Sequence, residues 1–226
     1  MKIALYGSGE FTDSVNEIDQ FLINKFNLKN VAVVPTAAGK EKDWYKWLDM
    51  AQTHFDKLNV NTIRIEVTNN KEANDPIIAN KIKQADWIFY SGGAPEYLFK
   101  SINNSLLWNL TLEKYKAGVL LSGSSAGAMI LGNYIIDKPF KAMLQKTDEN
   151  WQKTFGIVDY TILPHFNRMN QFKPLLNQLL KNTPNKIKDN LLGIDEDTAL
   201  LFENGQMIKL GGGNIELRQK NIVSNL

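Results

Sequence analysis

Apolar and polar positions alternate along the chain, up to about residue 132, in a way that predicts strands and helices in turn. Short continuous apolar runs, such as Val31–Val34, are typical of strands buried on both faces of a parallel sheet. Longer stretches between them repeat apolar residues at helical spacing. The expected strands lie near 2–6, 31–35, 61–67, 87–91 and 118–122, and the expected helices near 13–26, 42–58, 76–84, 95–116 and 126–132. This alternation predicts a three-layer α/β fold, with a mostly parallel sheet and helices on both faces.

The pattern changes after Gly132. Shorter strands, one helix near 168–181 and closing hairpins around Asn204-Gly205 are expected there. The segment 138–155 is mostly polar and has little periodicity, which in a compact domain is typical of a lid or a binding loop. No break in composition divides the chain, so its 226 residues are expected to form a single domain, 1–226.

The composition narrows the class of protein. A hydrophobic share of 43% and a charged share of 22% are ordinary for a globular domain. The net charge of +2 is too small, and the lysines are too scattered, to favour a nucleic-acid partner. No apolar run is long enough to span a bilayer, and Met1–Tyr6 leads into a strand rather than a signal peptide. A cytoplasmic protein with no membrane partner is therefore expected. The absence of cysteine excludes disulfides, thiolate catalysis and cysteine-based metal sites.

The segment 123–128 (Gly-Ser-Ser-Ala-Gly-Ala) lies between an apolar run and a helix-like one, which predicts a strand, a sharp turn and a helix with Ser125 at the apex. The backbone of a residue on such a turn is strained, so small residues must flank it. Ser125 would then be exposed and aimed, as a nucleophile must be. The other interpretation of so short a motif is a tight turn without chemistry.

A serine nucleophile needs a base, and the chain has two histidines. His165 follows a strand-like run that ends at Leu163, and open α/β sheets place their reactive groups at strand ends. We therefore interpret His165 as the candidate base. His54 lies in a stretch of helical period, where an ordinary helix residue near the surface is expected.

A triad also needs a carboxylate that orients the imidazole. Asp195, Glu196 and Asp197 follow a short apolar strand, and alternation should turn one of them toward the site. The pattern does not say which one. Asp137 and Asp159 are further candidates, and a solvated acidic turn is the other interpretation of the three consecutive acids.

The glycines at 92 and 93 end a further strand-like run, just before a helix that begins at Pro95. Glycine lets the backbone approach a ligand and leaves its N–H available as a donor. The N–H of Gly92 or Gly93, together with that of Ala126, is therefore expected to form a two-donor oxyanion hole.

The turn Gly7–Phe11 resembles half of a dinucleotide-binding fingerprint. It lacks the third glycine, and Glu10 would repel a pyrophosphate. A tight strand-to-helix turn without a cofactor is expected there.

Together these motifs resemble the family of serine peptidases that contains dipeptidase E and cyanophycinase, whose fold is similar to class I glutamine amidotransferases. The resemblance covers most of the chain, from the glycine-rich strand end and the elbow through Pro164-His165-Phe166 to the C-terminal hairpin. It implies Ser125 as nucleophile, His165 as general base and Glu196 as the third member, with Asp137 as the alternative acid. The chain order of serine, histidine and acid also differs from that of the α/β-hydrolases.

The resemblance implies a serine-dependent hydrolase of amide bonds that acts on small peptides and needs no metal or organic cofactor. The alternative function is a ligand-binding or regulatory module that keeps the elbow without turnover. An amidotransferase is disfavoured because its nucleophile would be a cysteine.

The residues that differ from the family pattern lie where substrate groups are expected to bind. Ala94-Pro95 stands where dipeptidase E has Asn, and Pro164 stands where cyanophycinase has Gln. Arg168 is a single arginine three residues after the candidate base, and we expect it to bind an anionic group of the substrate. The aromatic residues at 44, 45 and 47 suit packing against the sheet, stacking on a ligand or an oligomer contact, and packing against the sheet is the favoured role. A homodimer is a further candidate assembly.

Overall fold

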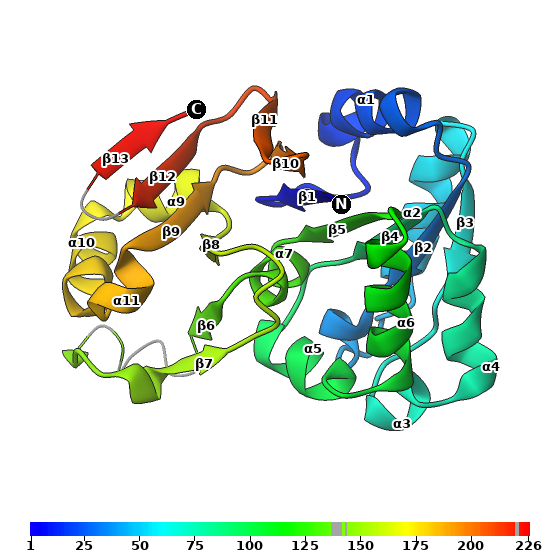
Figure 1. Ribbon diagram of the computed structural model, residues 1–226, viewed down its shortest axis with the longest axis horizontal. Helices are drawn as coiled ribbons and strands as arrows, with labels where there is room; N and C mark the ends of the chain where they lie inside the picture. Colours follow the sequence, from blue (N-terminus) through cyan, green and yellow to red (C-terminus); the bar gives the residue numbers. More distant parts are fainter. Residues whose placement is uncertain (137–141, 143, 220–221) are drawn as a thin grey trace.

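A large sheet forms the centre of the computed structural model, which describes residues 1–136, 142, 144–219 and 222–226 (Figure 1). Within these residues the sheet has seven strands in the order β11-β10-β1-β5-β4-β2-β3. They are β1 (Lys2–Tyr6), β2 (Asn30–Val34), β3 (Asn61–Arg64), β4 (Trp87–Tyr90), β5 (Leu120–Ser124), β10 (Thr198–Glu203) and β11 (Gln206–Gly211). The five neighbouring strands β1, β5, β4, β2 and β3 run parallel to one another. Strand β10 is antiparallel to β1, and β11 is antiparallel to β10. The predicted mostly parallel sheet is confirmed.

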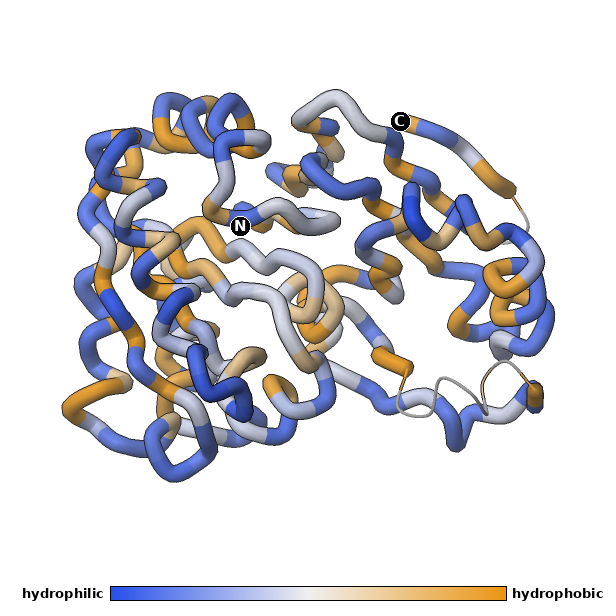
Figure 2. Tube along the Cα trace, turned by 180° about the vertical axis from the view of Figure 1, so that it is seen from behind, coloured by the Kyte–Doolittle hydropathy of each residue, from blue (hydrophilic) through white to orange (hydrophobic). Residues whose placement is uncertain are grey.

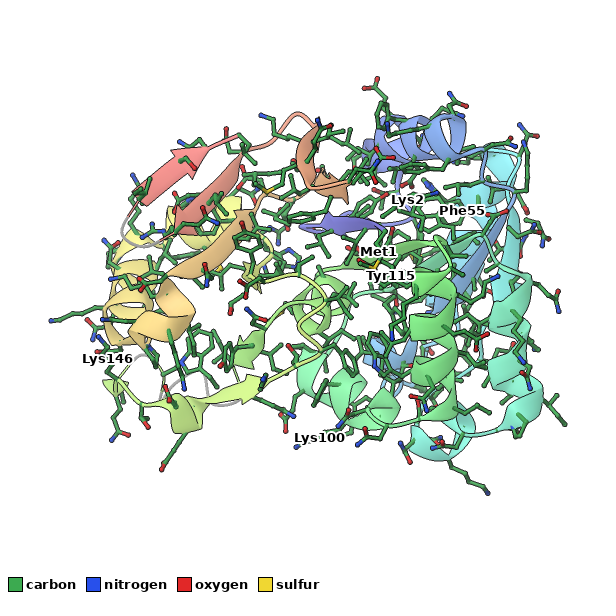
Figure 3. The ribbon with its side chains drawn as sticks, viewed as in Figure 1. Met1, Lys2, Phe55, Lys100, Tyr115 and Lys146 are labelled. Carbon is green, nitrogen blue, oxygen red and sulfur yellow. The ribbon has the colours of Figure 1, made fainter. Side chains whose placement is uncertain are left out.

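Helices cover both faces of this sheet. They are η1 (Asp13–Val15), α1 (Asn16–Phe26), η2 (Thr36–Ala38), α2 (Lys46–Lys57), α3 (Asn70–Ala73), α4 (Pro76–Ala79), η3 (Asn80–Gln84), α5 (Pro95–Ile102), α6 (Leu106–Lys116) and α7 (Ala126–Leu131). Because side chains alternate along a strand, Phe89 packs with α1 and α2 on one face, while Ile88 packs with α4 to α7 on the other. The ring centroids of Phe55 on α2 and Trp87 lie 5.1 Å apart, and Figure 3 labels Phe55. The chain therefore forms the three predicted layers, with apolar residues along the central strands (Figure 2).

A second sheet lies beside the β10 side of the first (Figure 1). In the described residues its order is β13-β12-β9-β8, with β8 and β9 parallel and the other pairs antiparallel. Its strands are β8 (Thr161–Leu163), β9 (Asn190–Ile194), β12 (Ile215–Gln219) and β13 (Ile222–Asn225). Between β8 and β9 the chain forms α9 (Phe166–Gln171), α10 (Lys173–Asn182) and α11 (Asn185–Lys188). A separate apolar cluster, with Phe166 and Leu176 in it, joins these helices to β8 and β9.

A small two-stranded sheet connects the two parts: β6 (Tyr134–Ile136) pairs with β7 (Trp151–Lys153), which follows η4 (Asp148–Asn150). Residues 137–141 and 143, with Asp137 among them, lie outside the described residues. No helix within the described ranges combines the length and the apolar character that crossing a membrane requires.

Two of the predicted helices each form two separate α-helices. The segment 95–116 forms α5 and α6, because Asn104 adopts a left-handed conformation (φ 58°) and Ser105 begins a new helix by accepting a hydrogen bond from Trp108 N. The segment 168–181 is likewise split between α9 and α10. Phe172 (φ −105°, ψ 49°) leaves the helical conformation, and the proline in the first turn of α10 suits a helix start rather than an interior.

The prediction that His54 lies near the surface is wrong. Its side chain is 2% exposed, and its Nε2 lies 2.6 Å from Asp19 Oδ2. The hydroxyl of Tyr6 donates to the other oxygen of this carboxylate at 2.5 Å. Burial raises the pKa of Asp19 above its ordinary value, although the hydrogen bonds from His54 and Tyr6 act in the opposite direction. The three side chains join α1, α2 and β1 in one buried polar network.

Replacing Asp19 by alanine is expected to destabilise the fold by about 3–5 kcal/mol, because it leaves His54 and the Tyr6 hydroxyl buried without their partner. Urea unfolding measures this loss. The matched control is Asp56→Ala on the exposed side of α2, which should change the free energy of unfolding by no more than about 0.5 kcal/mol. Equal free energies of unfolding for the two variants would show that the network of Asp19, His54 and Tyr6 does not stabilise the fold.

Candidate active site

Ser125 lies on the predicted sharp turn, between the end of β5 at Ser124 and the start of α7 at Ala126. Its backbone is strained, with φ 48° and ψ −111°. The turn is also crowded: a Cβ atom on Gly127 would lie 2.1 Å from Tyr90 O, and one on Gly123 would lie 2.4 Å from the carbonyl of Gly127. Only glycine fits these positions, which explains the small residues around Ser125.

His165 and Glu196 come from the second sheet. His165 lies two residues beyond the end of β8 and immediately before α9, in a left-handed conformation (φ 51°), and its N–H donates to Gly7 O at 3.3 Å. Glu196 lies two residues beyond the end of β9. Its N–H donates to Asn167 Oδ1 at 3.1 Å, which connects the two strand ends.

The three side chains form a continuous chain of hydrogen bonds. Ser125 Oγ lies 2.9 Å from His165 Nε2, and His165 Nδ1 lies 2.7 Å from Glu196 Oε1. A carboxylate only accepts, so Nδ1 is the protonated nitrogen and Nε2 is the acceptor that faces Ser125. The side chains are therefore placed as a nucleophile, a base and an orienting acid would be.

Arg168 lies at the Glu196 end of this series of hydrogen bonds. Its Nε donates to Glu196 Oε2 at 2.7 Å, while its own side chain is 70% exposed. Partial burial raises the pKa of Glu196, but the hydrogen bonds from His165 and Arg168 outweigh this effect and hold the pKa below its ordinary value. Glu196 is therefore ionised at neutral pH, when it would stabilise an imidazolium.

The neighbouring acids have other partners. Asp195 is buried and accepts from the backbone N–H of Asn214 at 2.8 Å. Asp197 accepts from Ser14 Oγ at 2.6 Å. Asp159 accepts from the Asn133 side chain at 2.8 Å. Of these four acids in the described residues, only Glu196 contacts His165.

The expectation of a free N–H on Gly92 is wrong. This group donates to the side chain of Glu10, with Gly92 N and Glu10 Oε1 2.7 Å apart. Gly93 and Ala126 remain as candidate oxyanion donors, because Ala126 is the first residue of α7 and has no acceptor within the helix. The turn after β1 brings Glu10 to the end of β4, a contact that residue spacing does not reveal.

A cavity of about 470 Å³ opens beside Ser125. Its lining includes every predicted site residue except Ala126, and it also includes six residues outside the predicted site. These are Ser8, Gly9, Glu10, Thr12, Trp47 and Met50. Their only signal in the sequence is the polar turn after the first strand and the aromatic start of the second long helix. None of the described residues between 144 and 155 lines this cavity, so they give no support to a lid there.

Another cavity, of about 310 Å³, lies at the opposite end of β1. Met1 and Tyr115, which Figure 3 labels close together, form part of its lining. No serine, threonine or histidine of the described residues lines it, so it offers neither an aliphatic hydroxyl nucleophile nor an imidazole base.

Known relatives match most of the chain. The model of peptidase family S51 matches residues 3–210. Peptidase Lin0382 of Listeria innocua is 27% identical over an alignment of 218 residues that covers 94% of this chain and 99% of that protein. A cyanophycinase of Geminocystis herdmanii is 25% identical over an alignment of 173 residues that covers 72% of this chain and 60% of the cyanophycinase.

Solved structures show the same fold. A peptidase from an acI-B1 Actinobacterium matches with a TM-score of 0.86 and 27% identity, over 100% of this chain and 93% of that one. A peptidase E from Listeria monocytogenes EGD-e matches with a TM-score of 0.64 and 20% identity, over 94% and 98% of the two chains, which supports the fold alone. The resemblance inferred from the motifs is confirmed, and the chain belongs to peptidase family S51.

Proposed function

We propose that this peptidase hydrolyses amide bonds of small peptides with Ser125, His165 and Glu196 as its catalytic triad. The strongest support is the distance of 2.9 Å between Ser125 Oγ and His165 Nε2, on a strained turn that opens onto the cavity. The cavity of about 470 Å³ has the size of a small-molecule site, which favours short peptides.

In the proposed reaction, Ser125 Oγ attacks the scissile carbonyl carbon while His165 Nε2 takes the hydroxyl proton. The N–H groups of Ala126 and Gly93 donate to the oxyanion, and Glu196 stabilises the imidazolium through Nδ1–H. His165 then gives the proton to the leaving amine, and an acyl-enzyme remains on Ser125. A water molecule, deprotonated by His165, attacks this ester and releases the carboxylic acid and the free serine.

Arg168 is proposed to bind a carboxylate of the substrate. Its Nε donates to Glu196 Oε2, and the two terminal nitrogens of the guanidinium are further donors on a side chain that lines the cavity. A peptide with an acidic group near the scissile bond fits this site. The cytoplasmic location, the homodimer and the absence of a nucleic-acid partner stay predictions from the sequence.

Replacing Arg168 by alanine is expected to lower kcat/KM for an acidic peptide amide by about 30-fold more than for its neutral isostere. A loss common to both substrates would come from the broken hydrogen bond to Glu196. Steady-state kinetics on the two substrates separate these effects. Equal losses would exclude Arg168 as the residue that binds the carboxylate.

A screen of purified protein against dipeptides and isopeptides, with Ser125→Ala protein as the blank, tests the proposed function. Hydrolysis of at least one class above the blank is expected. If no member of the library is cleaved faster than the blank, a binding module without turnover becomes the better interpretation.

A further inference from the structure

Three consecutive backbone N–H groups follow β4, and the middle one has no acceptor in the described residues. Gly92 N donates to Glu10 Oε1 at 2.7 Å, and Ala94 N donates to Ala37 O at 2.9 Å. Between them, the N–H of Gly93 takes part in no hydrogen bond with the described part of the chain. The flanking hydrogen bonds therefore hold this proposed oxyanion donor on both sides and leave it unused.

The side chain of Glu10 connects this turn to the turn that carries the nucleophile. Its Oε1 accepts from Gly92 N, and its Oε2 accepts from the hydroxyl of Ser124 at 2.5 Å. Ser124 is the last residue of β5, two residues before Ala126, the second proposed oxyanion donor. One carboxylate thus bridges the two segments that supply the two donors.

This bridge is buried and closely fitted. Glu10 is 5% exposed and Ser124 is completely buried, so water competes little for the hydrogen bonds. A Cβ atom on Gly92 would lie 2.7 Å from Glu10 Oε1, so a side chain there would push the carboxylate away from the backbone. On the other side of the turn, a Cβ atom on Gly93 would lie 2.6 Å from the carbonyl of Ala37. These contacts leave the turn little room to shift.

The two donors need such a connection because the sheet does not supply it. Strands β4 and β5 are neighbours, but their paired residues end at Tyr90 and Gly123, before either donor. An oxyanion hole is effective only if both donors point at the place where the negative charge develops. A displacement of about 1 Å costs about 10²-fold in rate. The distance between the two strand ends is therefore a property that affects catalysis.

We propose that Glu10 is a positioning residue that sets the distance between the two oxyanion donors, the N–H groups of Gly93 and Ala126. This inference rests on the proposed function, in which these groups stabilise the oxyanion. Glu10 acts through its two acceptor atoms, one for each segment. Both of its partners are neutral donors, so the hydrogen bonds and not the negative charge perform this role.

Four variants separate the hydrogen bonds from the charge. In Glu10→Gln the amide oxygen still accepts from Gly92 N, and the amide nitrogen donates to Ser124 Oγ, which is able to accept. Glu10→Ala removes both acceptors, and Ser124→Ala breaks one of the two hydrogen bonds. Ser14→Ala is the matched control, because its hydroxyl joins the segment after β1 to Asp197 instead, at 2.6 Å.

Steady-state kinetics on the best-cleaved dipeptide of the library measure the effect, and thermal unfolding shows whether each variant is folded. In Glu10→Ala we expect kcat to fall about 100-fold, while KM changes by less than about threefold, because the donors act mainly in the transition state. Glu10→Gln should restore kcat to within about threefold of wild type. Ser124→Ala should lie between these two, and Ser14→Ala should keep its kcat. The rate at which a fluorophosphonate labels Ser125 should follow the same order, because its phosphonyl oxygen enters the same hole.

A kcat of folded Glu10→Ala within about threefold of wild type would overturn the positioning role. An equal loss in folded Glu10→Gln would also overturn it, because the effect would then come from the charge. If Glu10→Ala does not fold, Ser124→Ala decides, and an unchanged kcat in that variant contradicts the bridge. Ser125-dependent hydrolysis that none of these changes affects refutes only the role of Glu10. No Ser125-dependent hydrolysis or labelling in the wild type refutes the proposed function, and the inference with it.

Discussion

Replacing Ser125 by alanine is expected to reduce peptide hydrolysis by up to about 10⁶-fold in kcat, with the fold unchanged. The hydroxyl forms the covalent bond to the substrate, and no neighbouring group of the triad is able to replace it. Alanine removes one oxygen on a turn already formed by small residues, so the thermal transition should stay near that of the wild type. Steady-state kinetics and circular dichroism measure the two effects.

Ser122→Ala is the matched control because it removes a hydroxyl from the same strand at a different place. Ser122 is buried, and its Oγ accepts from Trp87 Nε1 at 2.8 Å and not from a member of the proposed triad. We expect this variant to lose about 1–3 kcal/mol of stability and to keep its kcat. Near-wild-type turnover by Ser125→Ala would exclude Ser125 as the nucleophile.

Glu196→Gln is expected to lower kcat by about 10⁴-fold. The amide has nearly the same shape as the carboxylate, but it carries no charge to stabilise the imidazolium. Its nitrogen is also able to donate to His165 Nδ1, which would move the imidazole proton to Nε2, the atom that must accept from Ser125. Binding of substrate should change much less than kcat.

The controls for Glu196 are the adjacent acids. Asp195→Asn and Asp197→Asn alter side chains that contact Asn214 and Ser14 rather than His165, so smaller losses in kcat are expected. Asp137→Asn belongs in the same series, because Asp137 is the alternative acid and lies outside the described residues. If Asp137→Asn lowers kcat most, the third member of the triad is Asp137.

Features that depend on local chemistry were predictable from the sequence. The strained turn at Ser125 follows from small residues between a strand and a helix, and the structure has φ 48° there. The alternation of apolar runs and helical periods likewise predicts the layers of the large sheet. His165 was identifiable because histidine is rare in this chain and this one follows a strand.

Features that depend on distant contacts were not predictable in this way. The family resemblance indicated Glu196, but the residue pattern alone did not choose among the three consecutive acids. That choice depends on β9 and α9, which place the Glu196 side chain against His165. The burial of His54 depends on Asp19, which lies 35 residues away on another helix. Glu10 reaches Gly92 across 82 residues, and this contact removes an N–H that the glycine motif alone makes available.

Reaction with a fluorophosphonate tests the central claim most directly, because only an activated serine is phosphonylated quickly. The protein is incubated with the reagent at neutral pH, and the labelled peptide is identified by mass spectrometry. The account predicts rapid, single-site labelling on Ser125, which is slowed by orders of magnitude in Glu196→Gln and absent in Ser125→Ala. Labelling of another residue, or equally slow labelling of all three proteins, would contradict an activated serine at this site.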